Sequence, residues 1–475
     1  AAALTFGLLR FVGPATPAGE IQSIAVLPFE NTGGDPDAEY LSDGITESLI
    51  NSLSKLPGLR VIPRSSAFRF KGSATDPQEA ARQLNVRAVV VGRVQQRGGR
   101  LVIGAELIDA ERNAQLWGEQ YNRPASDIFS LQEEISRAIA GNLQVQLTGE
   151  AEEKLARRET NNAEAYRLYL RGRFHWNRRT TGDLRKALDF FQQAVRTDPG
   201  YALGYVGIAE SYLLLWEWGA LRSAEAIPPS RAAAEQALEL DPAGGEAYLT
   251  LAVIQAKHDW DWAGAEETFR RALELSPDYP TAHQWYGEYL SYMGRFEESL
   301  EEHRRAQELD PLSLIVNAVE VVAHTFARDY DRAIEQAKKV IEMDPNFRPA
   351  HGYLAGAYYG KGELALSADE GIEALRLDGI PREDLDALRR AYEAEGFEGY
   401  LNEDIRQLKR IDAPPIYIAI SYTLLNDRDA ALEWLEKGIK ARGPNVAMLG
   451  VDPQYDNLRD DPRFQSLLRR LNFPE

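Results

Sequence analysis

A chain of 475 residues is too long for a single hydrophobic core, so its length predicts two or three modules. Its net charge, 54 − 73 = −19, lacks the basic footprint of a nucleic-acid-binding protein, and we therefore predict no nucleic-acid partner. The sequence has no cysteine, which excludes disulfides, thiolate metal sites and cysteine nucleophiles. It has no stretch of about 18 apolar residues, so the chain as given does not span a membrane.

Residues 1–19 are predicted to form an apolar segment followed by a flexible tether rich in proline and glycine. Three interpretations are open: the end of a transmembrane helix, the rest of an export or anchor segment, or a segment that docks into another subunit. The expected partner of this segment is thus a membrane or a second copy of the chain. We expect an extracytoplasmic protein, membrane-anchored or secreted, and leave a cytoplasmic location open. The apolar side chains concerned are Leu4, Phe6, Leu8, Leu9, Phe11 and Val12.

Residues 20–147 are predicted to form a mixed α/β domain with one sheet. The expected order is strand, helix, strand, helix, three strands and helix. Asp76 is expected to cap the second helix, with Pro77 at its first position and Glu79 completing a capping box. Gly98-Gly99 predicts a hairpin between two of the strands. The segments are residues 23–31, 38–58, 59–62, a helix from 76, 86–110 with the hairpin, 114–122 and 128–139.

Two runs in this domain resemble a known family. SIAVLPFENTGGDPDAEYLSDGITESLINSLSKLPGLRVIPRSS (23–66) and VRAVVVGRVQQRGGRLVIGAELIDA (86–110) are similar to the TolB-like N-terminal domain. That domain recurs in bacterial signalling proteins ahead of tetratricopeptide repeats, commonly after a kinase, cyclase or DNA-binding domain. The resemblance implies a non-catalytic sensing or docking role and supplies no catalytic residues.

Residues 160–475 are predicted to form a helical repeat array. The tags QAVRTDP, QALELDP, RALELSP, RAQELDP and KVIEMDP end at Pro199, Pro242, Pro277, Pro311 and Pro345, with gaps of 43, 35, 34 and 34 residues. A period near 34 residues, with small residues where helices touch, resembles the tetratricopeptide repeat. We count about eight units, and expect residues 451–475 to cap the last helix pair. The predicted fold class is therefore α+β: a small mixed α/β domain followed by an all-α tetratricopeptide solenoid.

The first helices of such units line a concave groove that commonly binds protein or peptide. The resemblance places five residues on the floor of this groove. The alternative is that several of them bind no ligand and only keep the inner wall hydrated. They are Glu210, Gln284, Glu288, Ser291 and Tyr359.

Tryptophans gather at the turns of two helix pairs, as Trp216-Glu217-Trp218 and Trp260-Asp261-Trp262. We expect them to pack against the insertions that lengthen the early repeats. The alternative is an aromatic rim, formed by Trp216, Trp218, Trp260 and Trp262, that receives a peptide or glycan.

No set of residues predicts catalysis. Ser52-Leu53-Ser54-Lys55 matches the SxxK of serine acyltransferases, but its companion motifs are misplaced, so we expect an ordinary helix. The six histidines are scattered without metal-ligand spacing, and no phosphate-binding glycine loop is present. We therefore predict no enzyme activity, no metal and no cofactor.

Two functions are open at this point. The first is a non-catalytic protein-binding scaffold or sensor in a bacterial, membrane-anchored signalling protein. The second is a self-assembling structural protein whose apolar N-terminal segment docks into a neighbouring subunit.

Overall fold

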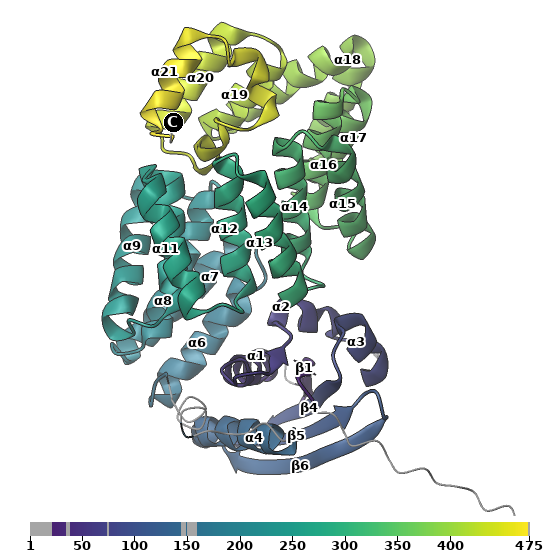
Figure 1. The fold of residues 1–475 in the computed structure, drawn as a ribbon, viewed down its shortest axis with the longest axis vertical. Helices are drawn as coiled ribbons and strands as arrows, with labels where there is room; N and C mark the ends of the chain where they lie inside the picture. Colours follow the sequence, from purple (N-terminus) through teal and green to yellow (C-terminus); the bar gives the residue numbers. More distant parts are fainter. Residues whose placement is uncertain (1–20, 35–38, 74–75, 144–148, 150–158, 474–475) are drawn as a thin grey trace, which may run out of the picture.

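The computed structural model describes residues 21–34, 39–73, 76–143, 149 and 159–473. A small α/β domain lies at one end of the molecule, and the helices of the array make up the rest (Figure 1). This arrangement confirms the predicted α+β class. Within the described residues, no helix combines the length and the apolarity that crossing a membrane would require.

One sheet forms the floor of the α/β domain, with strand order β3-β1-β4-β5-β6 and β2 (Glu30–Asn31) paired to β4. β1 (Ser23–Val26) runs parallel to β3 (Arg60–Val61) and to β4 (Ala88–Arg97). β4, β5 (Arg100–Asp109) and β6 (Ala114–Pro124) form an antiparallel meander. Gly98 and Gly99, with φ of 56° and 74°, make the predicted hairpin turn, which needs the left-handed region at both positions.

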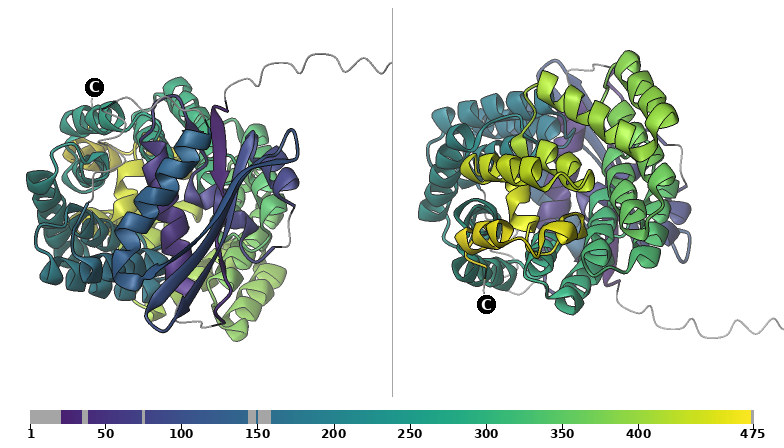
Figure 2. Two further views of the ribbon diagram at one scale, coloured as in Figure 1. Left: turned by 90° about the horizontal axis from the view of Figure 1, so that it is seen from below. Right: turned by 90° about the horizontal axis from the view of Figure 1, so that it is seen from above.

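Two helices, α1 (Glu39–Ser54) and α4 (Ile128–Asn142), cover the sheet on the side facing the array (Figures 1 and 2). The short helices α2 (Arg64–Ala67), η2 (Phe68–Phe70), α3 (Pro77–Leu84) and η3 (Ala125–Asp127) complete the domain. Asp76 caps α3 as predicted, by accepting a bond from Gln78 N. The capping box was wrong, because the Glu79 carboxylate pairs with Arg82 and Gln83 further along the helix.

The array consists of antiparallel helix pairs. The Asp-Pro or Ser-Pro tags end the second helix of five of them, where proline prevents the helix from continuing. The pairs are α6 (Ala163–Trp176) with α7 (Thr181–Thr197), α8 (Ala202–Glu217) with α9 (Ser223–Leu240), α10 (Gly245–Ile254) and η4 (Gln255–Asp259) with α11 (Trp262–Leu275), α12 (Pro280–Tyr292) with α13 (Phe296–Leu309), α14 (Leu314–Phe326) with α15 (Tyr330–Met343), and α16 (Arg348–Lys361) with α17 (Leu364–Leu377).

Small residues let these helices approach closely. The fully buried Phe191 ring of α7 fits between Gly172 of α6 and Gly207 of α8. A methyl group at either glycine would lie only 2.4 Å or 2.7 Å from the ring, so only glycine leaves room for it. Later, α18 (Arg382–Arg410) bends at Gly396, whose φ of 66° and ψ of −151° interrupt the helix. This bend divides α18 into two helical segments.

The end of the array returns to its beginning. The pair α19 (Pro415–Leu424) and α20 (Arg428–Lys440), followed by η5 (Pro444–Met448), η6 (Pro453–Leu458) and α21 (Pro462–Arg470), lies beside α8–α12 (Figure 2, right). Trp216 Nε1 donates to Arg442 O at 3.2 Å and Trp262 Nε1 to Leu471 O at 2.7 Å. The Trp262 ring stacks on Phe473 at 4.8 Å. The C-terminal segment therefore contacts early helices as well as the last pair, and the array is a closed ring.

Candidate ligand chamber between the domain and the ring

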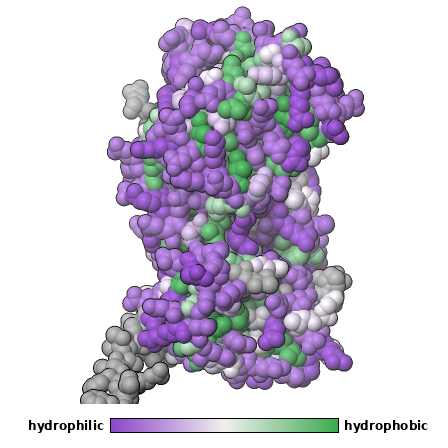
Figure 3. Space-filling view, turned by 90° about the vertical axis from the view of Figure 1, so that its right-hand side faces the viewer, coloured by the Kyte–Doolittle hydropathy of each residue, from purple (hydrophilic) through white to green (hydrophobic). Residues whose placement is uncertain are grey.

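A cavity of about 2510 Å³ lies inside the ring and reaches the α/β domain; we call it the chamber. The domain contributes the C-terminal half of α1 and the segment from β3 to η2. The ring contributes mainly the first helices of its pairs, among them α12, α14 and α16. The seam between domain and ring is largely hydrophilic on the side shown in Figure 3.

The α/β domain is fastened to two Asp-Pro turns of the ring. Ser66 Oγ donates to Asp310 at 2.5 Å and accepts from Leu312 N at 2.7 Å, and Ser65 bonds to the same carboxylate. Burial raises the pKa of Asp310 in spite of these serine hydrogen bonds. At the next turn, Arg69 donates to Met343 O at 2.6 Å. The tags that end the repeats thus also serve as the docking points of the domain.

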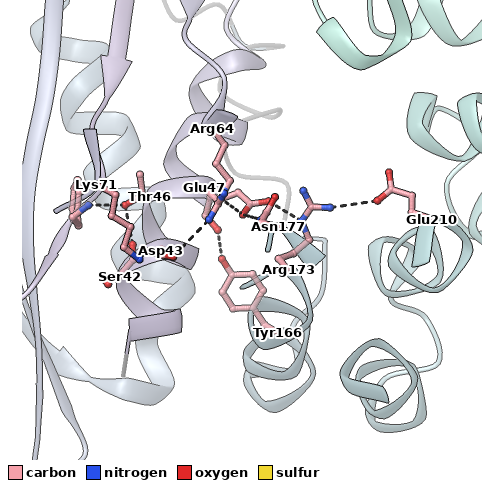
Figure 4. A network of polar contacts seen from close by, with 12 residues as sticks. Ser42, Asp43, Thr46, Glu47, Arg64, Lys71, Tyr166, Arg173, Asn177 and Glu210 are labelled. Atoms are coloured by element: carbon pink, nitrogen blue, oxygen red, sulfur yellow. Dashed lines mark hydrogen bonds and ion pairs between the residues drawn. The ribbon is translucent and has the colours of Figure 1, made fainter. Parts of the chain in front are cut away.

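A buried cluster of charges joins the domain to the first helix pairs (Figure 4). Glu47 of α1 accepts from Arg173 of α6 at 2.7 Å and from Asn177 at 3.2 Å, and lies 3.0 Å from Arg64 Nε. Burial alone would raise the pKa of Glu47, but the two arginines bring it below its ordinary value. Glu47 is therefore ionised at neutral pH and holds α1 against α6.

Glu210 of α8 is the outer member of the same cluster. Its carboxylate lies 3.4 Å from Arg173 Nη1 and is 5% exposed. Burial raises its pKa to about 7, which the attraction of Arg173 only partly offsets. The contact between α6 and α8 thus changes charge close to neutral pH.

A second cluster lies on the wall formed by α8, η4 and α12. Lys257 Nζ is 2.7 Å from Glu217 and 3.6 Å from Glu288. Gln284 and Tyr292 also bond to Glu288, at 3.0 Å and 3.3 Å. The π-helical turn η4, which ends at a left-handed Trp260 (φ 60°), brings Lys257 to this position. The wall presents paired charges and tyrosine to the chamber.

The five predicted groove residues do not all lie in one place. Gln284, Glu288 and Ser291 line the chamber. The hydroxyl of Ser291 is already bonded to Ser299 at 2.7 Å. Glu210 reaches the chamber only through Arg173, and Tyr359 instead faces α18, where its ring stacks on Phe397 at 6.0 Å.

The proposed aromatic rim is not formed. Trp216, Trp260 and Trp262 are buried, and only Trp218, 41% exposed, reaches solvent. The prediction that the tryptophans pack against the insertions was incomplete, because the indoles of Trp216 and Trp262 also donate hydrogen bonds to the C-terminal segment that closes the ring. The N-terminal docking residues between Leu4 and Val12 lie outside the described part of the chain.

Sequence reasoning missed the charges that face the chamber: Glu47, Arg64, Arg173, Arg179 and Lys257. Little in the sequence pointed to Glu47, because it lies two residues from both Ile45 and Leu49 and therefore on another face of α1, which is also buried in the structure. Its partner Arg173 is 126 residues away, and no local pattern connects the two.

The described residues contain no cluster of side chains arranged for a metal ion. Two histidines instead repeat one structural device. His283 Nδ1 bonds to Glu302 at 2.6 Å and its Nε2 to Pro277 O at 2.8 Å. His351 makes the same pair of bonds with Glu370 and Pro345 O, at 2.7 Å and 3.0 Å. Each therefore ties the start of one pair to the proline turn before it.

Comparison with known families identifies both modules. A family described as HilA/YgeH-like transcriptional regulator, second domain, matches residues 20–138, so the α/β domain is HilA-like and the TolB-like resemblance is not confirmed. The tetratricopeptide repeat matches residues 227–280 and 321–379, which confirms the repeat array. A solved structure described as YrrB, a TPR protein with an unusual peptide-binding site, overlaps with a TM-score of 0.28 at 20% identity, covering 40% of this chain and 93% of that one.

Two relatives carry regulatory names. Putative adenylate cyclase 3 of Rhizobium meliloti is 35% identical over 245 residues, 50% of this chain and 40% of the relative, so this match spans less than half of the cyclase. Transcriptional regulator HilA of Salmonella typhimurium is 23% identical over 409 residues, 85% of this chain and 72% of the regulator. The prediction that nucleic acid is not a partner rested on net charge alone. The match to a transcriptional regulator makes that exclusion doubtful.

Proposed function

We propose that this chain is the non-catalytic regulatory region of a bacterial signalling or transcription-regulating protein, and that its chamber binds a segment of a protein. The tetratricopeptide array supports the scaffold role, since such arrays present extended concave binding surfaces. The two relatives named above carry different outputs, a cyclase and a transcriptional regulator, which fits a shared region that receives a signal rather than one that performs the output reaction.

The size of the chamber carries the proposal. At about 2510 Å³ it exceeds the range of about 300–1,000 Å³ that is typical of small-molecule sites. Its walls combine inner ring helices with the docked α/β domain, so a ligand inside touches both modules. An extended polypeptide segment fits this volume, and its binding would change how firmly the domain is held.

Photocrosslinking in cells tests this assignment with two matched positions. Ile315, 37% exposed, lines the chamber, whereas Leu366, 42% exposed, lies on α17 outside it. A photoreactive phenylalanine analogue at position 315 should capture a defined protein segment, identified by mass spectrometry, and the same analogue at position 366 should not. Capture at neither position, or of the same proteins at both, would overturn the proposal.

A further inference from the structure

One cation of the chamber wall, Arg179, forms no ion pair with the described residues. Arg179 lies in the turn between α6 and α7, with a left-handed φ of 52°, and lines the chamber. Among the lysines and arginines of the chamber wall, Arg179 alone forms neither an ion pair nor a side-chain hydrogen bond with the described residues. The surrounding protein, together with nearby Arg173, lowers the pKa of Arg179 to about 10 although its side chain is exposed, and the group stays charged at neutral pH.

The side chain of Arg179 is held in place without being neutralised. Its guanidinium carbon lies 3.8 Å from the centre of the Trp176 ring, and Arg173 lies over the same indole at 4.4 Å. A guanidinium stacked on an aromatic face keeps its N–H edge free to donate in its own plane. Arg179 is surrounded by protein yet open to the water inside the chamber, so that edge is available to a ligand. The indole N–H of Trp176 also lacks a partner among the described residues, but it is buried and closed to the chamber.

Building on the proposed function, we infer that Arg179 is the anchor for a carboxylate of the bound protein segment. The planar fork of arginine matches a carboxylate through two parallel hydrogen bonds. The surroundings favour a single negative charge over several, because the carboxylates of Glu210 and Glu217 also act on Arg179 and would repel further negative charge. A phosphate strand would need a row of cations, and the other cations of this wall are already engaged. The ligand is thus a polypeptide with one acidic group, either a side chain or a C-terminus.

Peptide selection separates this inference from the proposed function. Random decapeptides displayed with a blocked C-terminus, and others displayed with a free C-terminus, are selected against the wild-type chain and against Arg179→Gln. Selections on the wild-type chain should give one of two results. Either Asp or Glu is enriched at one position of the peptides with a blocked C-terminus, or only peptides with a free C-terminus are enriched. The variant should lose that preference. Enriched peptides without an acidic group would overturn the anchor while leaving the protein-binding chamber in place. No enrichment in either format would overturn both.

A double-mutant cycle then measures the contact. A selected peptide, labelled with fluorescein, should bind Arg179→Gln between about tenfold and about a hundredfold more weakly than wild type. Replacing its acidic residue by the amide, or amidating its C-terminus, should weaken wild-type binding equally and leave binding to Arg179→Gln unchanged.

Two controls complete the measurement. Arg382→Gln, at a side chain 92% exposed on α18, should bind like wild type. If neutralising the carboxylate of the peptide weakened binding to wild type and to Arg179→Gln by the same factor, Arg179 would not touch the carboxylate. A short poly-deoxythymidine strand that binds more tightly than the peptide, and does so through Arg179, would overturn the carboxylate assignment in favour of phosphate.

Discussion

The closure of the ring can be tested at the Trp262 indole. Replacing Trp262 with Phe keeps an aromatic ring against Phe473 but removes the N–H that donates to Leu471 O at 2.7 Å. Leu471 is fully buried, so its carbonyl would lose its partner without gaining water. An unsatisfied buried acceptor costs about 1–3 kcal/mol, and the smaller ring adds about 1 kcal/mol, giving about 2–4 kcal/mol in total.

Native-state hydrogen exchange shows where this free energy acts. Because about 1.4 kcal/mol corresponds to a factor of ten, amides of α21 should exchange about 30-fold to several hundredfold faster in the variant. Amides of α8 and α11 should follow, since the same contacts secure both sides of the closure. Trp434→Phe is the matched control, because Trp434 is half-buried on α20 at the edge of the same core, has two lysines over its ring, and its indole forms no hydrogen bond with the described residues. Faster exchange in α21 alone, or no change in either place, would refute the coupling of the two ends.

Three further outcomes are expected. Ala272→Leu should overpack the contact beside Phe269 and lower stability by about 1–3 kcal/mol, whereas the exposed Ala232→Leu should not; equal melting midpoints would contradict the repeat register. The pKa of Glu210 is about 7 when folded and 4.5 in the ordinary state, so the stability it contributes is complete below pH 4.5 and is lost as the pH rises through about 7. The melting temperature of Glu210→Gln should therefore change less with pH between these values. If its dependence on pH equalled that of the wild type, Glu210 would be excluded as the cause of that dependence. Deleting residues 1–18 should leave both modules folded but abolish membrane flotation or self-assembly seen by light scattering; identical behaviour of the two chains would show that the segment is inert.

Local patterns were sufficient for most elements of the fold. The Asp-Pro tags end helices where expected, and the α/β domain follows the predicted order of strands and helices apart from the short β2, α2, η2 and η3. These signals act over a few residues, because proline, glycine and side-chain periodicity restrict the backbone near themselves. The misassigned capping box shows the limit, since Glu79 had equally close partners within its own helix.

The chamber could not be predicted in the same way. Its contacts join residues far apart in sequence, such as Trp262 with Leu471, or Ser66 with Asp310. Whether such residues meet depends on small rotations accumulated over successive helix pairs, which no single repeat specifies. Tyr359 illustrates this, because it holds a groove position in the repeat and yet faces the bent helix α18.

Closure also changes how the array responds to force and to local damage. An open solenoid behaves like a spring whose end repeats fray first, because each end repeat has only one neighbour. Here α21 and the preceding turns lie on the early pairs, so both margins are covered. If one interface between helix pairs breaks, the remaining interfaces still connect all pairs of the ring. The ring separates only when a second interface breaks at the same time. Pulling on the two ends of the array, at Ala163 and Arg470, should thus load the closure contacts first, and the array should yield in one large step instead of repeat by repeat.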